Sequence, residues 1–173
     1  MQSTATKLKT ENLDYKLGND TFEGFVAYDE SKSGKRPSVV VCHAWAGQMD
    51  AERDITKKLA ELGYLGFAAD VYGKGVRGDI QGDNTNLMMP LLQDRTLLKN
   101  RLLASVEAAS KHAMSESDKV AVIGYCFGGL CVLDLAAPTP RSRRGELPRT
   151  FFSTRLENRK TNQTQNFNST RMG

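Results

Sequence analysis

Apolar and polar residues alternate along the chain in a pattern that predicts strands and helices in turn. Two alternating runs, Lys7–Leu17 and Thr21–Tyr28, flank a Gly-Asn-Asp turn and predict a β-hairpin. Short runs that are apolar on both faces predict buried strands at Ser38–Cys42, Tyr64–Ala69 and Lys119–Ile123. Helical spacing predicts helices over Asp50–Leu62, Asn86–His112 and Leu130–Ala137, with Pro90 in the first turn of the second. This order is typical of a mostly parallel sheet with helices on both faces, which is the α/β class.

The periodic pattern ends after Ala137, and the composition changes there. Residues 138–173 carry seven Arg and one Lys against two Glu, whereas the residues before them are slightly acidic. The segment contains three prolines, and its last part is mostly Asn, Thr, Gln and basic residues, a composition that buries too little apolar surface to fold. Thr150–Thr154 is a short, weak candidate strand. We therefore predict one incomplete α/β domain at residues 1–137 and a disordered basic tail, unrelated to that domain, at residues 138–173.

Composition excludes several classes of protein. Met1 to Asp20 holds no continuous apolar run, so we expect no signal peptide, no membrane partner and a cytoplasmic location. Cys42, Cys126 and Cys131 are an odd number of cysteines, which favours free thiols. Two histidines and the lack of a C-x-x-C pair give too few ligands for zinc, and we expect neither a metal nor a cofactor. The net charge of +4 belongs to the tail, so we do not expect the domain to bind nucleic acid.

One segment carries candidate chemistry, Gly124-Tyr125-Cys126-Phe127-Gly128-Gly129. It follows a predicted strand and precedes a predicted helix, which is the context of a nucleophile elbow. So sharp a turn needs small neighbours two residues away on either side, as Gly124 and Gly128 are, and Gly129 would let the helix approach the strand closely. The N–H of Phe127 would point toward a developing oxyanion, and the loop His43–Gly47 would supply a second N–H. The alternative is that Cys126 is a small buried core residue.

Through this motif the chain resembles the dienelactone hydrolase family of α/β-hydrolases, whose cysteine nucleophile lies in a G-Y-C-x-G-G elbow. The resemblance covers about Thr21 to Ala137 and includes Val39 to Gly47 and Asp70-Val71-Tyr72. It implies a partial α/β-hydrolase fold in which Cys126 is the nucleophile and the N–H groups of Trp45 and Phe127 form the oxyanion hole. It also implies that the substrate is a small-molecule ester or lactone.

The sequence departs from the family around the nucleophile. Ala44 stands where family enzymes often carry a glutamate that holds the resting thiol. Arg77 and Arg95 lie in the region of the family's arginines for the substrate carboxylate, but we interpret them as solvated surface charges. No histidine follows Cys126, and the only later aspartate is Asp134 within the elbow helix, so the order nucleophile, acid, histidine is not completed.

Three hypotheses about function remain open. The chain is an ester or lactone hydrolase with little or no turnover, because His43 and His112 precede the elbow and we expect neither to replace the missing base. The second hypothesis is that the chain is a truncated or frame-shifted form of such an enzyme, in which Val120–Ile123 becomes an exposed sheet edge and causes self-association. The third is a non-enzymatic fragment or binding module whose basic tail contacts nucleic acid or an anionic surface through its Arg residues, although no recognised binding fold accompanies the tail.

Overall fold

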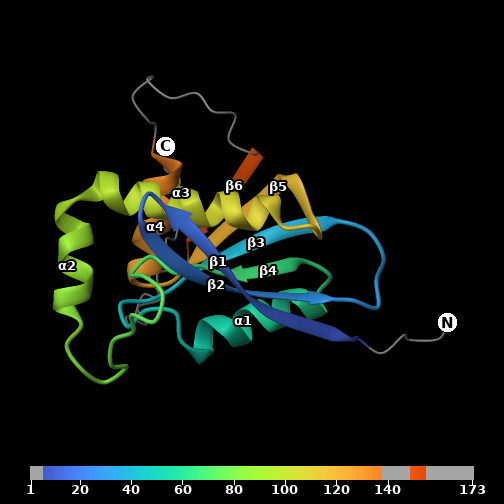
Figure 1. Ribbon diagram of the computed structural model, residues 1–173, viewed down its shortest axis with the longest axis horizontal. Coiled ribbons are helices and arrows are strands. Elements are labelled where there is room, and N and C mark those ends of the chain that lie inside the picture. The colour runs from blue at the N-terminus through green and yellow to red at the C-terminus, as the bar shows by residue number, and fades with distance from the viewer. Residues whose placement is uncertain (1–5, 138–148, 155–173) are drawn as a thin grey trace, which may run out of the picture.

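The computed structural model describes residues 6–137 and 149–154. Six strands form one mixed sheet in the order β1-β2-β4-β3-β5-β6 (Figure 1). Their bounds are β1 Leu8–Leu17, β2 Asp20–Asp29, β3 Arg36–Cys42, β4 Leu65–Ala68, β5 Ser115–Gly124 and β6 Arg149–Thr154. The hairpin strands β1 and β2 are antiparallel to each other and to their neighbours, and β4, β3, β5 and β6 run parallel. The predicted α/β fold with an N-terminal hairpin is confirmed.

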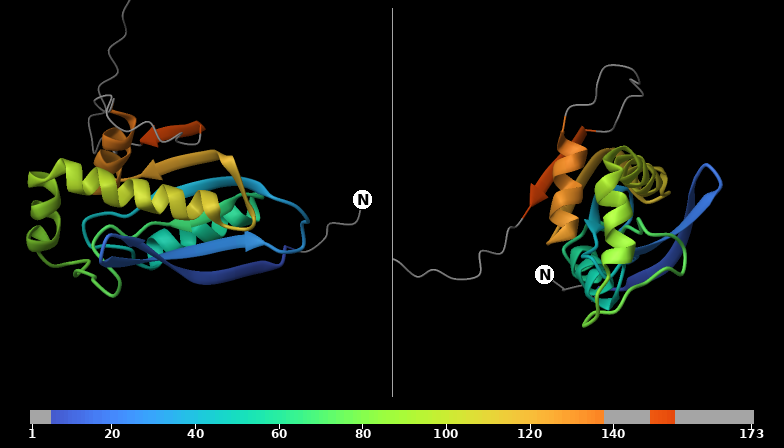
Figure 2. Two further views of the ribbon diagram at one scale, coloured as in Figure 1. Left: turned by 45° about the horizontal axis from the view of Figure 1, so that its top comes forward. Right: turned by 90° about the vertical axis from the view of Figure 1, so that its left-hand side faces the viewer.

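Helices cover both faces of this sheet. Successive strand residues point to opposite sides, so an apolar strand gives both faces apolar side chains to bury. Val26 of β2 and Phe67 of β4 belong to the main core, whereas their chain neighbours Ala27 and Ala68 belong to a small second core on the other face. Helix α1, Asp50–Glu61, packs on β2 and β4 over the small core. Helices α3, Arg95–Lys111, and α4, Phe127–Ala136, pack together on β5 over the main core (Figure 2).

The long helix predicted over Asn86–His112 is wrong, because the chain forms two helices there. Helix α2 covers Thr85–Gln93, and α3 begins after Asp94, whose backbone at φ −116° and ψ 82° is not helical. The Asp94 carboxylate accepts the N–H of Leu97 at 2.8 Å and so caps α3. Pro90 lies inside α2 and not in its first turn. Hydrophobic spacing continued across the break, so the spacing alone did not reveal it.

Strand β5 is not a sheet edge. Strand β6 pairs with it in parallel, from Lys119 opposite Arg149 to Gly124 opposite Thr154. The prediction that Val120–Ile123 would be exposed along an edge is therefore wrong, and self-association through that edge loses its basis. The predicted tail at residues 138–173 is described only where it forms β6, and the rest of it lies outside the described residues.

Candidate active site

The elbow forms a sharp turn between β5 and α4. Strand β5 ends at Gly124, and α4 begins at Phe127, three residues earlier than the sequence predicted. Cys126 lies between them at φ 54° and ψ −119°, and it is the one non-glycine residue of positive φ in the described part of the chain. Such a conformation costs about 1–3 kcal/mol and persists only where the surrounding structure imposes it.

Backbone contacts explain two of the three elbow glycines. A Cβ atom on Gly124 would lie 2.2 Å from the carbonyl oxygen of Gly128, and a Cβ on Gly128 would lie 2.3 Å from the carbonyl oxygen of Cys42. A Cβ on Gly129 would meet its nearest atom at 3.6 Å, which is an ordinary contact. The elbow therefore requires glycine at Gly124 and Gly128, and the expectation that Gly129 is needed for close packing is wrong.

The three cysteines lie in different surroundings. Cys42 and Cys131 are buried, and Cys126 is exposed. Burial raises the pKa of the Cys42 thiol to about 12 and also raises that of Cys131, so both remain protonated at neutral pH. The alternative that Cys126 is a buried core residue is wrong.

Three successive carbonyl groups in the loop after β3 each accept a hydrogen bond from elsewhere in the protein. The carbonyl of Ala44 accepts from Nδ1 of His43 at 2.6 Å and from the N–H of Gly47 at 3.1 Å. The next carbonyl, of Trp45, accepts from the hydroxyl of Tyr72 at 2.8 Å. The third, of Ala46, accepts from the N–H of Gly78 at 2.8 Å. Each carbonyl of this stretch is thus occupied by a donor from the protein itself.

The N–H groups of the same loop differ from its carbonyls. Glu52 of α1 accepts the N–H of Ala44 at 3.3 Å and that of Met49 at 2.9 Å. Among the described residues, the N–H of Trp45 has no acceptor, and neither does that of Phe127 at the start of α4. Because β3 and β5 are neighbours and Cys42 pairs with Gly124, the loop and the elbow leave the sheet side by side. Two N–H groups without acceptors, one next to the exposed cysteine in the chain and one in the adjacent loop, are the kind of donors that an oxyanion hole needs.

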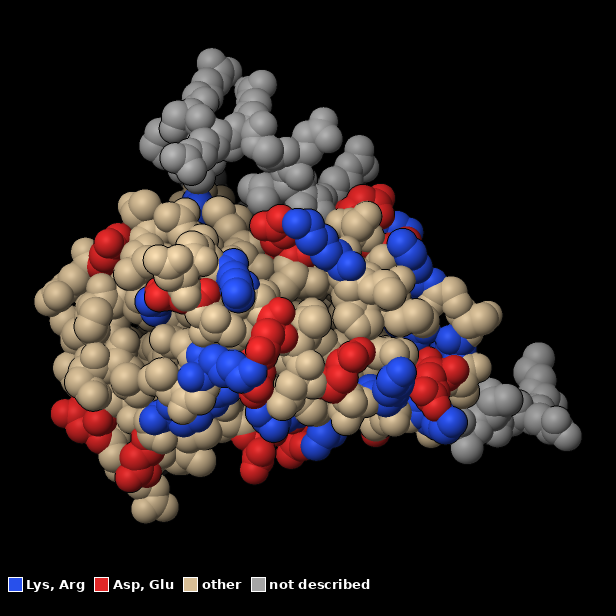
Figure 3. All heavy atoms as spheres, viewed as in Figure 1, with Lys and Arg blue, Asp and Glu red and all other residues tan. Residues whose placement is uncertain are grey.

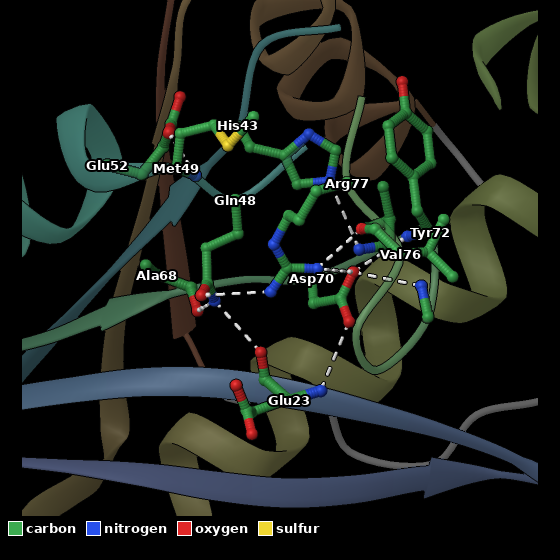
Figure 4. Close-up of polar contacts among 12 residues, drawn as sticks. Glu23, His43, Gln48, Met49, Glu52, Ala68, Asp70, Tyr72, Val76 and Arg77 are labelled. Carbon is green, nitrogen blue, oxygen red and sulfur yellow. Dashed lines mark hydrogen bonds and ion pairs between the residues drawn. The ribbon is translucent and has the colours of Figure 1, made fainter. Parts of the chain in front are cut away.

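Both ring nitrogens of His43 make hydrogen bonds, and Figure 4 shows one of them among the neighbouring polar contacts. Its Nε2 atom accepts the N–H of Val71 at 3.3 Å, so the proton is on Nδ1, which donates to Ala44. The ring is buried against Tyr72, with 4.7 Å between ring centres, and burial lowers the pKa of the imidazole. His43 is therefore neutral and hydrogen-bonded at both nitrogens.

The other candidates for a triad are also engaged elsewhere. His112 follows α3 at the opposite end of the sheet, where its Nε2 lies 3.0 Å from a carboxylate oxygen of Glu11. Asp134 accepts two hydrogen bonds from Arg95, one of them from Nε at 2.7 Å. The contacts of His43, His112 and Asp134 thus assemble no acid–histidine pair behind the thiol.

A buried carboxylate that the sequence analysis missed organises the neighbouring loop (Figure 4). Asp70 follows β4 and is fully buried, and its Oδ1 accepts the N–H groups of Tyr72 and Gly73 at 3.0 Å each. Its Oδ2 accepts the N–H of Glu23 at 3.2 Å, and a guanidinium nitrogen of Arg77 lies 3.8 Å from Oδ1. Arg77 is mostly buried, so its interpretation as a solvated surface charge is wrong. The Asp-Val-Tyr segment at the end of an apolar strand was the available signal.

Charges of both signs are interspersed on the face shown in Figure 3, without a continuous basic stripe. The basic residues that motivated the binding-module hypothesis lie mainly between residues 138 and 173, largely outside the described part. Within the described residues, no helix combines the length and apolarity needed to cross a bilayer.

Comparison with known proteins identifies the family. The model of the "Dienelactone hydrolase family" matches residues 22–162, which is most of the chain. The chain belongs to the dienelactone hydrolase family. The match extends past Ala137, where the sequence analysis placed the end of the homologous part, and includes β6.

Relatives of this dienelactone hydrolase family member are longer than it is. A "Putative carboxymethylenebutenolidase" of Aquifex aeolicus is 33% identical over 116 residues, covering 65% of this chain and 50% of that protein. A "Probable 2-oxo-3-(5-oxofuran-2-ylidene)propanoate lactonase" of Bradyrhizobium sp. is 30% identical over 112 residues, covering 64% and 44%. The chain thus spans about half the length of these curated relatives.

Solved structures agree with this assignment. The crystal structure of a dienelactone hydrolase-like promiscuous phosphotriesterase from metagenomic libraries superposes with a TM-score of 0.72 at 32% identity, covering 75% of this chain and 54% of that one. A structure from Klebsiella pneumoniae, with a TM-score of 0.64 and 20% identity over 78% of this chain and 56% of that one, shares the fold.

Proposed function

We propose that this chain carries the acylation half of an ester or lactone hydrolase, with Cys126 as the nucleophile. The observation that carries the proposal is the elbow itself. The only positive-φ non-glycine residue among those described is an exposed cysteine at the junction of β5 and α4. The N–H of Phe127, next in the chain, and that of Trp45, in the loop after the neighbouring strand β3, have no acceptor among the described residues. The printed names of the relatives, a carboxymethylenebutenolidase and a lactonase, support lactones and esters as the substrate class.

The proposed step is the transfer of an acyl group to sulfur. The thiol gives its proton to solvent, and the thiolate attacks the carbonyl carbon. The carbonyl oxygen becomes an oxyanion that accepts hydrogen bonds from the N–H groups of Trp45 and Phe127. Collapse of this intermediate expels the alcohol oxygen, which takes a proton from solvent, and leaves a thioester on Cys126. Each lost oxyanion donor would cost about 10²- to 10³-fold in rate.

We further propose that the 173-residue chain, tested by itself, hydrolyses this thioester slowly. Deacylation needs a base to activate water, and general-base catalysis contributes about 10²- to 10⁴-fold. Both nitrogens of His43 are hydrogen-bonded, Asp134 is paired with Arg95, and no histidine follows Cys126.

The test is a reaction of the full chain with p-nitrophenyl acetate. We expect a burst of about one p-nitrophenolate per chain and an intact mass that rises by one acetyl group, placed on Cys126 by peptide mapping. Cys126→Ala should abolish both signals. Cys131→Ala is the matched control, because burial keeps that thiol protonated, and it should leave the burst unchanged.

Two results would contradict the proposal. Acetylation of Cys42 or Cys131 instead of Cys126 would show that the elbow does not direct the reaction. Continuous turnover without an accumulating acyl-enzyme would show that this chain already contains a deacylating base.

A further inference from the structure

We infer that His43 is a positioning residue that aims the Trp45 N–H into the oxyanion hole; this rests on the proposed function of Cys126. The role differs from that of a general base. His43 acts through the peptide bond that joins Ala44 to Trp45. It contacts neither the ester or lactone substrate nor the thiol of Cys126.

The geometry of that peptide carries the inference. All peptide bonds between described residues are trans, so the carbonyl of Ala44 and the N–H of Trp45 point in opposite directions from one rigid plane. The Ala44 carbonyl accepts hydrogen bonds from Nδ1 of the buried His43 at 2.6 Å and from the N–H of Gly47 at 3.1 Å. Fixing the oxygen on the side of His43 directs the Trp45 N–H to the opposite side, where it has no acceptor among the described residues.

The second nitrogen of His43 connects this peptide to the end of β4. The N–H of Val71 donates to Nε2 at 3.3 Å, which leaves Nδ1 as the protonated nitrogen. Val71 follows Asp70, whose carboxylate holds the turn at Tyr72 and Gly73. The imidazole thus bridges a rigid turn to the oxyanion loop, and its buried ring leaves it little freedom to move.

A comparison of two reactions at the same sulfur separates positioning from folding. Acetylation by p-nitrophenyl acetate passes through an oxyanion, whereas alkylation by iodoacetamide displaces iodide from a saturated carbon and forms none. The ratio of the two rates at Cys126 therefore reports on the oxyanion hole alone. His43→Leu removes both hydrogen bonds at similar volume, and His43→Asn keeps a side-chain N–H near the position of Nδ1. His112→Leu is the matched control at the far end of the sheet.

We expect His43→Leu to lower the ratio of acetylation to alkylation about 10- to 100-fold, approaching the loss of one oxyanion donor. His43→Asn should recover most of the ratio, and His112→Leu should leave it unchanged. Equal ratios for His43→Leu and His43→Asn would overturn the inference. So would a ratio that stays constant while both rates fall together, because that pattern reports a general loss of structure.

Nuclear magnetic resonance provides a test that does not need acylation. The nitrogen shifts of the His43 imidazole in the full chain should show a proton on Nδ1 at neutral pH, and a proton on Nε2 would overturn the inference. If the wild-type chain is not acetylated on Cys126, the proposed function fails by itself, and the tautomer together with the Trp45 amide shift in His43→Asn still decides whether His43 orients the peptide.

Discussion

The two ends of the parallel strands handle polar groups in opposite ways. At the N-terminal end, Asp29 accepts the N–H groups of Lys7 and Ser31 at 3.0 Å each, and the buried hydroxyls of Ser38 and Ser115 pair at 2.7 Å. At the C-terminal end, the loop after β3 and the elbow leave N–H groups without acceptors in the described structure.

The difference lies in what each end binds. At the N-terminal end, donors and acceptors of the protein satisfy one another, so this end contributes to stability. At the C-terminal end, side chains donate hydrogen bonds to the carbonyls of Ala44 and Trp45. The groups of these peptides that remain available on the opposite side are N–H donors. An arrangement of free donors at the carboxyl ends of parallel strands suits a negatively charged group that comes from a ligand.

The largest effect should come from Gly128→Ala, which forces a Cβ to within 2.3 Å of the Cys42 carbonyl oxygen. Because the clash is with backbone, β3 or α4 must shift, and we expect a loss of about 3 kcal/mol or more in the free energy of unfolding. Urea unfolding followed by circular dichroism measures it. The same substitution at Gly129 meets only a 3.6 Å contact and should be neutral or stabilise the helix by up to about 1 kcal/mol. Equal losses in the two variants would contradict the account of the elbow.

A second effect should distinguish Asp29 from Asp70, two buried carboxylates at opposite ends of the parallel strands. Both carboxylate oxygens of Asp70 accept backbone N–H groups. Asp70→Asn therefore places an amide N–H against a backbone donor, and we expect a loss of about 2 kcal/mol in the free energy of unfolding. Asp29 receives its hydrogen bonds on Oδ1 alone, so asparagine can keep them. Urea unfolding of Asp29→Asn should therefore show the smaller loss. The reverse order would mean that charge, and not hydrogen-bond geometry, decides the effect.

The sequence predicted the elements better than the contacts among them. Apolar runs placed β3, β4 and β5, and the glycine-flanked cysteine located the elbow, because both signals are local. The roles of His43 and Asp70 depend on partners 28 and 47 positions away along the chain, Val71 and Glu23. Strand β6 was predicted only weakly for a similar reason. Its pairing with β5 is a tertiary contact, which a short apolar run in the sequence does not reveal.

A third effect concerns acid, and it is confined to the C-terminal end. Burial lowers the pKa of His43, so the unfolded chain binds a proton below about pH 6.5 that the folded chain resists. The stabilisation is complete above that pH and declines as the pH falls toward the lowered pKa of the folded state, by up to about 1.4 kcal/mol per pH unit. Asp70 and Glu52 near the ring favour its protonation, and Arg77 opposes it.

The measurement is the difference in urea stability between wild type and His43→Asn as a function of pH. Groups that titrate alike in both proteins cancel, and we expect the wild type to lose more stability than the variant between neutral pH and about pH 5. If the free energy of unfolding changed with pH in the same way in both proteins, His43 would be protonated as easily in the folded chain as in the unfolded one. That result would contradict the conclusion that His43 is neutral in the folded chain.

The smallest effect should come from a hydroxyl. Burial raises the pKa of Tyr72, so the phenol remains a donor to the Trp45 carbonyl at neutral pH. Tyr72→Phe leaves that carbonyl unpaired and should cost about 1 kcal/mol in urea unfolding. Because Trp45 is the only tryptophan of the chain, its emission also reports on this loop.

Ser38→Ala is the counterpart at the N-terminal end, where it leaves the Ser115 hydroxyl unpaired in the same way. We expect a similar loss of about 1 kcal/mol but an unchanged Trp45 emission, since β3 separates the two sites. If Tyr72→Phe lowers stability and also leaves the emission unchanged, the hydroxyl stabilises the fold without holding the loop. The orientation of the loop would then rest on His43 and on the backbone of Gly78, which donates to the next carbonyl.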